Sequence, residues 1–522
     1  MTVLTDLAVP LLHDHLLQTA ARLPDKVAVV CKGVQVSYAE MNAASNAMAH
    51  ALVRRGVRRG ARVIVFADNT VEAAIAFWAV LKANAVVSVV NPLTKADKLA
   101  YLLNDCRAVA LVTDAHLAGV YQAAIERSPH VRAVIVSGSP DESSLAKLPA
   151  GIGWEAALAG EERATPPARK AIDVDLAAIV YTSGSTGEPK GVMLTHRNML
   201  TAAASVSTYL GLRESDVVLM VMPMAFDYGL YQMIMSFRVG ARVVIERSFA
   251  FPAAVLNVMV KEGVSVFPGV PTIYAVLTEM KTLASYDLSR IRVVTNTAAA
   301  LPLKHIQRLC ELFPTAQIFS MYGLTECKRC TYLPPADLAR KPTSVGIAIP
   351  NTEMWLVDEN DQRVPAGQVG QLVIRGATVM RGYWEKPEAT AKKLRPGPLP
   401  GELVLYTGDY GSMDEDGYLY FVGRMDDIIK SRGEKVAPKE VENAITNIPG
   451  VKETAVVGVP DQVLGQAVKA FVVLEQGAKL TEQDIRRECQ SRLENFMVPK
   501  FVALVDDLPK TTTGKIRKTD LS

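Results

Sequence analysis

Short β-branched runs alternate with helical segments through the first third of the chain, and this alternation restricts the folds open to it. Strands are predicted at residues 27–31, 63–66, 86–90 and 108–113, and helices at residues 11–22, 38–55, 71–82 and 95–104. Such alternation produces parallel sheets covered by helices. After residue 200 it resumes, with strands predicted at residues 217–222, 241–245, 264–267, 291–295 and 317–320. We therefore expect an α/β protein with two helix-covered sheets.

The pattern of predicted helices and strands changes twice in the last third of the sequence. Between residue 353 and about residue 422, short strands are separated by turns, which predicts a small antiparallel or β-barrel-like unit. The last hundred residues predict a small α+β unit, with helices at 439–447 and 481–493, the second capped by Thr481, and strands at 451–459 and 467–474. A chain of 522 residues is too long for one core. We expect a large domain over residues 1–422 and a small domain over residues 429–522, with the junction between them at residues 423–428.

Composition excludes several classes of protein. Lys and Arg number 57 against 54 for Asp and Glu, a balance that predicts no nucleic-acid partner. The most apolar segment, residues 73–90, is interrupted by Lys82 and Asn84, so no membrane span is expected. The first residues lack a basic start, which predicts no secretory signal. Six scattered cysteines favour a reducing compartment, the cytoplasm, and Cys327 and Cys330 lack further ligands at metal spacing.

The sequence YTSGSTGEPKGVMLTH, residues 181–196, follows an apolar run that predicts a buried strand. Backbone N–H groups and hydroxyls of such a stretch can surround phosphate oxygens, and Lys190 adds a positive charge. The spacing differs from that of the P-loop. On composition alone, a Ser/Thr/Gly run is more often a plain surface loop.

Four later motifs favour the phosphate-binding interpretation. They are MYGLTE at residues 321–326, YTGD at 406–409, GRMDDIIKSRGEKVAPKEVE at 423–442 and PKTTTGKIRK at 509–518. Together with residues 181–196 they resemble, in order and spacing, the adenylate-forming superfamily of acyl-CoA synthetases, luciferases and adenylation domains of nonribosomal peptide synthesis. The resemblance implies a large adenylation domain followed by a small domain that rotates between two half-reactions.

The resemblance implies roles for individual residues in ATP binding. Tyr322 would stack on adenine, for which a planar ring offers a large apolar face. Asp409 would accept hydrogen bonds from the ribose hydroxyls. Glu326 would hold Mg²⁺, a hard cation that prefers carboxylate oxygen. The complete expected set of ATP-binding residues is Thr182, Ser183, Gly184, Ser185, Thr186, Gly187, Lys190, Tyr322, Thr325, Asp409 and Arg424.

The expected catalytic residues are Thr325, Glu326, Lys430 and Lys515. By resemblance, Lys515 would bridge the substrate carboxylate and the α-phosphate, because two anions approach each other only if a cation screens them. Asp426 would be the pivot of the hinge. Lys430 and Gly433 would face the site in the second half-reaction, where the missing Cβ of Gly433 lets a pantetheine arm pass. Lys515 is close to the end of the small domain, so it can act at the nucleotide only if that domain folds over the large one.

The resemblance places the acid pocket at Phe226, Asp227, Tyr231, Thr297 and Met321. Asp227 has two interpretations: it binds the α-ammonium of an amino acid, or it caps the helix that follows or has another polar structural role. We favour the structural interpretation. Thr297 would narrow the cavity against very bulky acyl chains.

Arg329 and Cys330 border the pocket by alignment with amino-acid domains. A cation there would favour a substrate with a second acidic or polar group, although an exposed arginine in a salt bridge is the interpretation we favour.

These features predict an AMP-forming acid–thiol ligase that uses ATP, Mg²⁺ and a small carboxylic acid, with coenzyme A as the leading thiol. The alternative is a free-standing adenylation enzyme that loads an amino or aryl acid onto the phosphopantetheine of a carrier protein. A non-enzymatic acyl-nucleotide sensor is a further possibility, against which the presence of both Lys430 and Lys515 argues.

Overall fold

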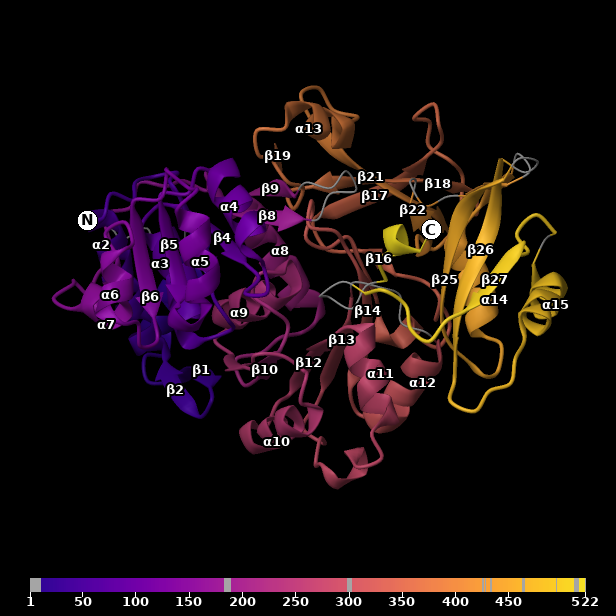
Figure 1. The fold of residues 1–522 in the computed structure, drawn as a ribbon, viewed down its shortest axis with the longest axis horizontal. Helices are drawn as coiled ribbons and strands as arrows, with labels where there is room; N and C mark the ends of the chain where they lie inside the picture. The colour runs from indigo at the N-terminus through magenta and orange to yellow at the C-terminus, as the bar shows by residue number, and fades with distance from the viewer. Residues whose placement is uncertain are drawn as a thin grey trace.

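The computed structural model describes residues 11–182, 189–297, 303–424, 427, 429–431, 434–461, 465–493, 495–510 and 516–521. Two large sheets with their helices form the N-terminal part, an antiparallel unit adjoins them, and a small α+β unit follows on the far side (Figure 1). The α/β fold with a large N-terminal and a small C-terminal domain is therefore confirmed.

The first large sheet has eight strands in the order β19-β9-β8-β4-β3-β5-β6-β7. Their bounds are β3 Arg62–Phe66, β4 Val86–Val90, β5 Ala110–Asp114, β6 Ala133–Ser137, β7 Ile152–Gly153, β8 Leu176–Thr182, β9 Lys190–Thr195 and β19 Gly382–Tyr383. Strands β3 to β8 run parallel, whereas β9 is antiparallel to both β8 and β19.

The second large sheet has nine strands in the order β16-β15-β14-β13-β12-β10-β11-β1-β2. Their bounds are β1 Val27–Cys31, β2 Val34–Ser37, β10 Val217–Met220, β11 Arg242–Ile245, β12 Val266–Gly269, β13 Val293–Asn296, β14 Gln317–Tyr322, β15 Thr331–Leu333 and β16 Ile347–Ala348. Because β10, β12, β13 and β14 are parallel, their carboxyl ends share one edge. The two sheets are interleaved along the chain, since β1 and β2 join the second sheet and β19 returns to the first.

The core lies between the sheets. Helices α3 and α8 pack on the eight-stranded sheet, and α2 and α9 pack on the nine-stranded one. Trp78 of α3 stacks on Phe237 of α9 with ring centroids 5.2 Å apart, so the two layers meet directly. The bounds of the helices of these sheets are α1 Asp14–Arg22, α2 Tyr38–Arg54, α3 Val71–Lys82, α4 Ala96–Asp105, α5 Ala118–Ile125, α6 Glu142–Ala146, α7 Trp154–Leu158, α8 His196–Tyr209, α9 Asp227–Val239, α10 Pro252–Glu262, α11 Pro271–Glu279 and α12 Leu303–Leu312.

The predicted antiparallel unit is present as a five-stranded sheet in which β18 pairs with β17 and β21, and β21 pairs with β20 and β22. Its bounds are β17 Thr352–Val357, β18 Val369–Gly376, β20 Leu394–Pro396, β21 Leu403–Met413 and β22 Leu419–Arg424, with α13 at Pro387–Lys393.

The C-terminal unit has its own sheet and its own apolar cores. Its bounds are β23 Ile429–Ser431, β24 Glu434–Val436, β25 Val451–Asp461, β26 Gly465–Leu474, β27 Phe501–Leu504, α14 Pro438–Thr446 and α15 Glu482–Arg492. Thr481 caps α15 as predicted, because its hydroxyl accepts the N–H of Asp484 at 3.2 Å.

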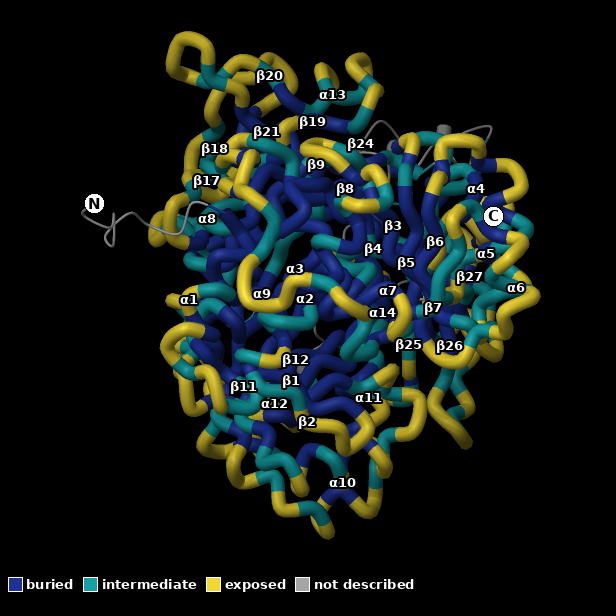
Figure 2. Tube along the Cα trace, turned by 90° about the vertical axis from the view of Figure 1, so that its left-hand side faces the viewer, coloured by how far each residue is buried: buried dark blue, intermediate teal, exposed yellow. Residues whose placement is uncertain are grey.

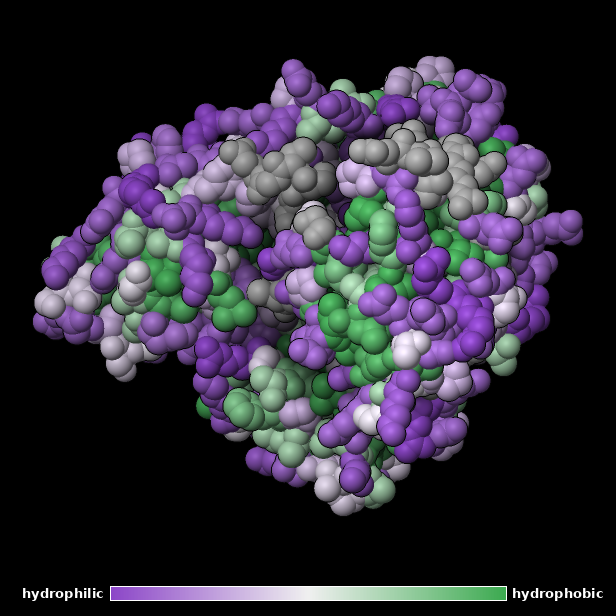
Figure 3. All heavy atoms as spheres, turned by 45° about the vertical axis from the view of Figure 1, so that its right-hand side comes forward, coloured by the Kyte–Doolittle hydropathy of each residue, from purple (hydrophilic) through white to green (hydrophobic). Residues whose placement is uncertain are grey.

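Buried residues follow the strands of both large sheets and the helices between them, and exposed residues follow the outer loops (Figure 2). On the face drawn in Figure 3, hydrophilic residues cover most of the surface. Among the described residues, none of the helices combines the length and the apolarity that crossing a bilayer requires.

Two buried histidines make stability sensitive to acid. Burial lowers the pKa of His196 to about 4 and that of His15 to about 3. Both are therefore neutral in the folded chain but gain a proton below about pH 6.5 when unfolded. The contribution of these two histidines to the free energy of unfolding is complete above that pH. It declines as the pH falls toward their pKa values in the folded chain. Between pH 7 and 5 we expect a loss of about 2 kcal/mol for each.

Urea unfolding at the two pH values measures this loss. The variant His196→Gln should lose less stability than the unmodified chain over this interval, whereas His130→Gln, at an exposed position, should behave like the unmodified chain. Identical losses in all three would contradict the assignment to His196.

Candidate functional site

Three predicted ATP-binding residues from three separate motifs meet in the structure. The hydroxyl of Tyr322, at the end of β14, donates to Oδ2 of Asp409, and Nε of Arg424 lies 3.2 Å from Oδ1. Asp409 and Arg424 face each other across β21 and β22. Asp409 is only 4% exposed. Burial beside this carboxylate raises the pKa of the Tyr322 phenol, so the hydroxyl remains a donor.

The carboxylate of Glu326 is held by a residue that the sequence did not point to. The hydroxyl of Tyr383, in β19, donates to Oε1 of Glu326 at 2.6 Å, and the N–H of Met380 donates to its carbonyl at 2.7 Å. Lys190 Nζ lies 5.7 Å from the centroid of the Tyr383 ring. No spacing in the sequence indicates Tyr383, because its position results from the pairing of β19 with β9.

The predicted phosphate loop connects the two strands of a hairpin. Ser183 to Gly187 lie outside the described residues, but the positions on either side are described. Thr182 at the end of β8 pairs with Lys190 at the start of β9. The sequence predicted the strand before the loop and missed the one after it.

Several other expected residues lie outside the part of the chain that is described. Asp426, Gly433 and Lys515 are among them, and for Lys430 only the backbone position in β23 is described. The stretch that carries Lys515 is bounded by a bridge between Lys510 and Ile516.

The expectation that Asp227 caps α9 is wrong, whereas the polar structural role expected as its alternative is present as an ion pair. The cap position is Phe226, Asp227 is the first helical residue, and no side chain caps the helix. Oδ2 of Asp227 lies 3.5 Å from Nζ of Lys328. The start of α9 packs closely against the segment that follows β10. Gly229 makes this close packing possible, because a Cβ there would meet the carbonyl oxygen of Pro223 at 2.3 Å.

The expectation that Arg329 is exposed in a salt bridge is also wrong. Arg329 and its neighbour Lys328 are each only 3% exposed. Arg329 Nη1 donates to Oγ1 of Thr297, and its guanidinium lies 5.4 Å from the centroid of the Tyr228 ring. Lys328 Nζ lies 4.2 Å from the centroid of the Tyr231 ring. Burial lowers the pKa of Lys328 to about 7, although Asp227 opposes the shift.

The sequence contains one signal for this burial. Lys328 and Arg329 stand between Cys327 and Cys330, and cysteine is among the most buried residue types. Both cysteines are fully buried, with their sulfur atoms 3.1 Å apart.

The remaining predicted pocket residues lie on two sides of this cluster. The sulfur of Met321 accepts a hydrogen bond from the Tyr209 hydroxyl at 2.9 Å. Phe226 lines a cavity of about 280 Å³ together with Thr182. The end of β8 and the residue before α9 therefore line the same cavity.

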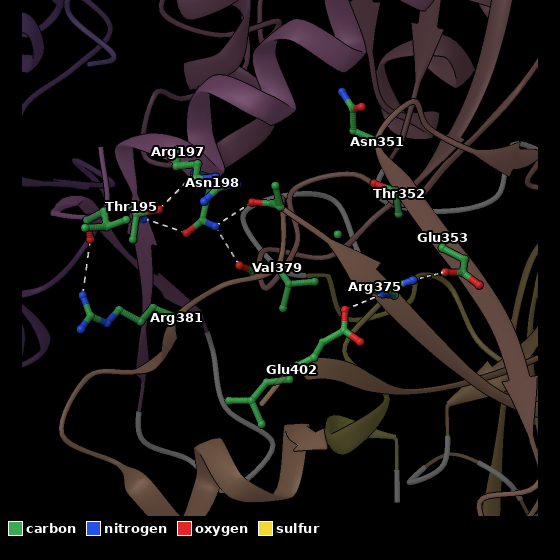
Figure 4. A pocket seen from close by; sticks show the side chains of 14 residues that line it. Thr195, Arg197, Asn198, Asn351, Thr352, Glu353, Arg375, Val379, Arg381 and Glu402 are labelled. Atoms are coloured by element: carbon green, nitrogen blue, oxygen red, sulfur yellow. Dashed lines mark hydrogen bonds and ion pairs between the residues drawn. The ribbon is translucent and has the colours of Figure 1, made fainter. Parts of the chain in front are cut away.

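A hollow of about 890 Å³ opens elsewhere, between the start of α8 and strands β17 and β18 (Figure 4). Its Arg375 is already paired with Glu353 at 2.9 Å and with Glu402 at 2.5 Å. Asn198 donates to the carbonyl oxygens of Ala377 and Val379 there. The chemically distinctive side chains lie at the Tyr322–Asp409 cluster, which we take as the candidate site.

Fold and site define a class: an α/β protein whose candidate site includes the carboxyl end of a parallel strand, the edge at which such sheets bind nucleotides. The family model of the AMP-binding enzyme matches residues 16–384, and that of the AMP-binding enzyme C-terminal domain matches residues 440–515. The chain belongs to the AMP-binding enzyme family.

Two relatives show how far the likeness extends. A long-chain-fatty-acid–CoA ligase of Bacillus subtilis (strain 168) is 32% identical over 98% of this chain and 94% of its own length. A 4-coumarate–CoA ligase 5 of Oryza sativa subsp. japonica is 32% identical over 99% of this chain and 96% of its own length.

A solved structure extends the likeness to three dimensions. The anthranilate CoA ligase AuaEII in complex with anthranoyl-AMP has a TM-score of 0.89 and 28% identity, and the match covers 99% of this chain and 98% of that one. The superfamily and the enzyme class, an AMP-forming acid–thiol ligase, are confirmed by these matches.

Proposed function

We propose that the chain joins a small carboxylic acid to coenzyme A and converts ATP to AMP and pyrophosphate. One observation supports this most: the hydrogen-bonded cluster of Tyr322, Asp409 and Arg424 beside Glu326. A buried carboxylate with a tyrosine and an arginine around it suits a ribose and an adenine. The names of the relatives, which are CoA ligases, support the choice of thiol.

In the first half-reaction, an oxygen of the substrate carboxylate attacks the α-phosphorus of ATP. The bond to pyrophosphate breaks, and an acyl-adenylate forms. The proposed phosphate ligands are Thr325, Lys190 and the hairpin residues 182–187, and Lys515 screens the two anions. The Glu326 carboxylate, half-buried and oriented by Tyr383, fits Mg²⁺, which would offset phosphate charge when bound.

In the second half-reaction, the thiol sulfur attacks the acyl carbon, the bond to AMP breaks, and the thiol proton passes to solvent. We propose that the domain of residues 429–522 rotates against residues 1–422 about a hinge at 423–428, with Asp426 as its pivot. Lys430 and Gly433 then face the site. The separate cores of the two parts support such a rotation.

A carrier-protein arm loaded with an amino or aryl acid is the alternative. An amino acid substrate needs a carboxylate that is available to its α-ammonium group. Asp227 is the candidate, but its carboxylate already lies 3.5 Å from a protein cation, Lys328. This pair favours an acid without an α-ammonium group.

Pyrophosphate release with a library of fatty, aryl, dicarboxylic and amino acids tests the function. Acid-dependent release, followed by a CoA thioester on addition of coenzyme A, is the expected result. Exchange only with amino acids, lost in Asp227→Ala, would favour the alternative. Neither ATP binding nor pyrophosphate release with any acid would refute the proposal.

Removing the Tyr383 hydroxyl should weaken the site through Glu326. In Tyr383→Phe the carboxylate loses its donor at 2.6 Å. We expect pyrophosphate release to slow about 10-fold, with a higher Mg²⁺ requirement. The matched control is Tyr418→Phe, whose hydroxyl donates to Asp337 in another part of the fold. Equal Mg²⁺ dependence in Tyr383→Phe and the unmodified chain would contradict this role.

The proposed compartment is the cytoplasm. All six cysteines are free thiols, which supports a reducing environment.

A further inference from the structure

Two basic side chains are buried side by side without a matching number of acids. Lys328 and Arg329 are each 3% exposed, and the carboxylate beside them is that of Asp227. Arg329 reaches a hydroxyl, that of Thr297, rather than a second carboxylate. Among the described residues, two cations therefore share one anion. A buried charge without a partner is unfavourable, so a site of this kind suits an incoming anion.

Polar atoms of both residues lack hydrogen-bond acceptors. Neither Nζ of Lys328 nor Nε of Arg329 has one within the described part of the chain. The nearest carboxylate oxygen to Nζ lies 3.5 Å away, at the outer limit of a hydrogen bond. Three ammonium protons and a guanidinium edge remain to be satisfied, and a carboxylate satisfies such groups well.

The two cations contact three of the five residues that are expected to line the acid pocket. Lys328 contacts Asp227 and Tyr231, and Arg329 contacts Thr297. The three contacted residues are among those that the resemblance assigns to the acid. They come from the start of α9 and the end of β13, and the cations come from the turn after β14, so all of them converge at the carboxyl edge of the parallel strands.

The backbone that carries the cations is specialised. Lys328 has a φ of 62°, in the left-handed region that lysine rarely adopts. Gly323 lets the turn fold back, because a Cβ there would meet the Lys328 carbonyl oxygen at 2.7 Å and Arg329 Cα at 2.8 Å. An exposed pair of basic residues needs no such geometry.

We propose that Lys328 and Arg329 bind a second carboxylate of the substrate, which makes the chain a ligase of dicarboxylic acids. This proposal rests on the proposed function: one carboxylate is adenylated, and the other lies against the two cations. The neighbouring rings of Tyr228 and Tyr231 would cover the apolar part between the two carboxylates.

A homologous series of aliphatic and aryl dicarboxylic acids, each compared with its half methyl ester, tests the substrate class. The half ester keeps the reacting carboxylate and the length but removes the second charge. We expect kcat/KM for pyrophosphate release to be about 100-fold higher for the best diacid than for its half ester. Equal values across the series would overturn the proposal and leave adenylation itself intact.

Two variants assign the preference to the cations. Lys328→Met should lower kcat/KM for the diacid far more than that for the half ester, so that the ratio of the two values falls about 100-fold. The control Lys261→Met removes an exposed charge on α10 and should change neither value. Arg329→Lys keeps the charge but loses the planar guanidinium. Its kcat/KM for the diacid should lie between those of the unmodified chain and of Lys328→Met.

The outcomes separate this inference from the proposed function. A diacid-to-half-ester ratio that is unchanged in Lys328→Met would overturn the role of the cation. If Lys328→Met fails to fold, the ratio in the unmodified chain decides the substrate class by itself. No pyrophosphate with any acid would refute the proposed function together with this inference.

Discussion

Replacing Lys515 by alanine is expected to slow pyrophosphate release about 1,000-fold and to leave thioester formation from supplied acyl-AMP largely intact. The lysine is proposed to screen two anions during adenylation only. In the proposed second half-reaction the small domain would have rotated, and that charge would no longer be at the nucleotide. The two half-reactions are measured separately, one by pyrophosphate release and the other by thioester from synthetic adenylate and coenzyme A.

The matched control is Lys479→Ala, an exposed lysine of the same domain, which should affect neither half-reaction. Equal losses in both half-reactions for Lys515→Ala would contradict a role confined to adenylation. Unchanged pyrophosphate release would remove Lys515 from the mechanism.

The variant Asp409→Asn should raise the KM for ATP about 100-fold. Asparagine keeps the shape of the buried side chain but removes the charge that Arg424 faces at 3.2 Å. It also removes the carboxylate that we propose as the acceptor for two ribose hydroxyls. It also offers the Tyr322 hydroxyl a weaker partner than the carboxylate does. Pyrophosphate exchange over a range of ATP concentrations gives the KM, and calorimetry gives the affinity for ATP.

A control on the same hairpin separates nucleotide binding from folding. Asp416, in the turn between β21 and β22, is 59% exposed in its ion pair with Arg340, and Asp416→Asn should leave the KM for ATP unchanged. An ATP affinity in Asp409→Asn equal to that of the unmodified chain would contradict the ribose assignment.

The sequence predicted the parallel core well, because buried parallel strands are continuous β-branched runs. Val86–Val90 is predicted to the residue, and Val27–Cys31 likewise. Strand β9 was missed because its partner precedes it across the loop of residues 183–189, and because Gly191 interrupts the apolar pattern.

The site was only partly predictable, because some of its contacts join residues that are far apart in sequence. Tyr322, Asp409 and Arg424 stand in distinctive motifs, and the structure brings them together. Arg329 was expected to be exposed, whereas the structure buries it against Thr297, which is 32 residues away in sequence. Local patterns carry no information on such contacts.

The interleaving of the two large sheets governs how the protein emerges from the ribosome. Strands β1 and β2 are synthesised first, but the partner of β1, Arg242–Ile245, appears only some two hundred residues later. In the same way, one edge of β9 stays unpaired until its partner Gly382–Tyr383 has been synthesised. At about 5–20 residues per second, tens of seconds pass with these strand edges open to aggregation, so the nascent chain has a long interval in which a chaperone is useful.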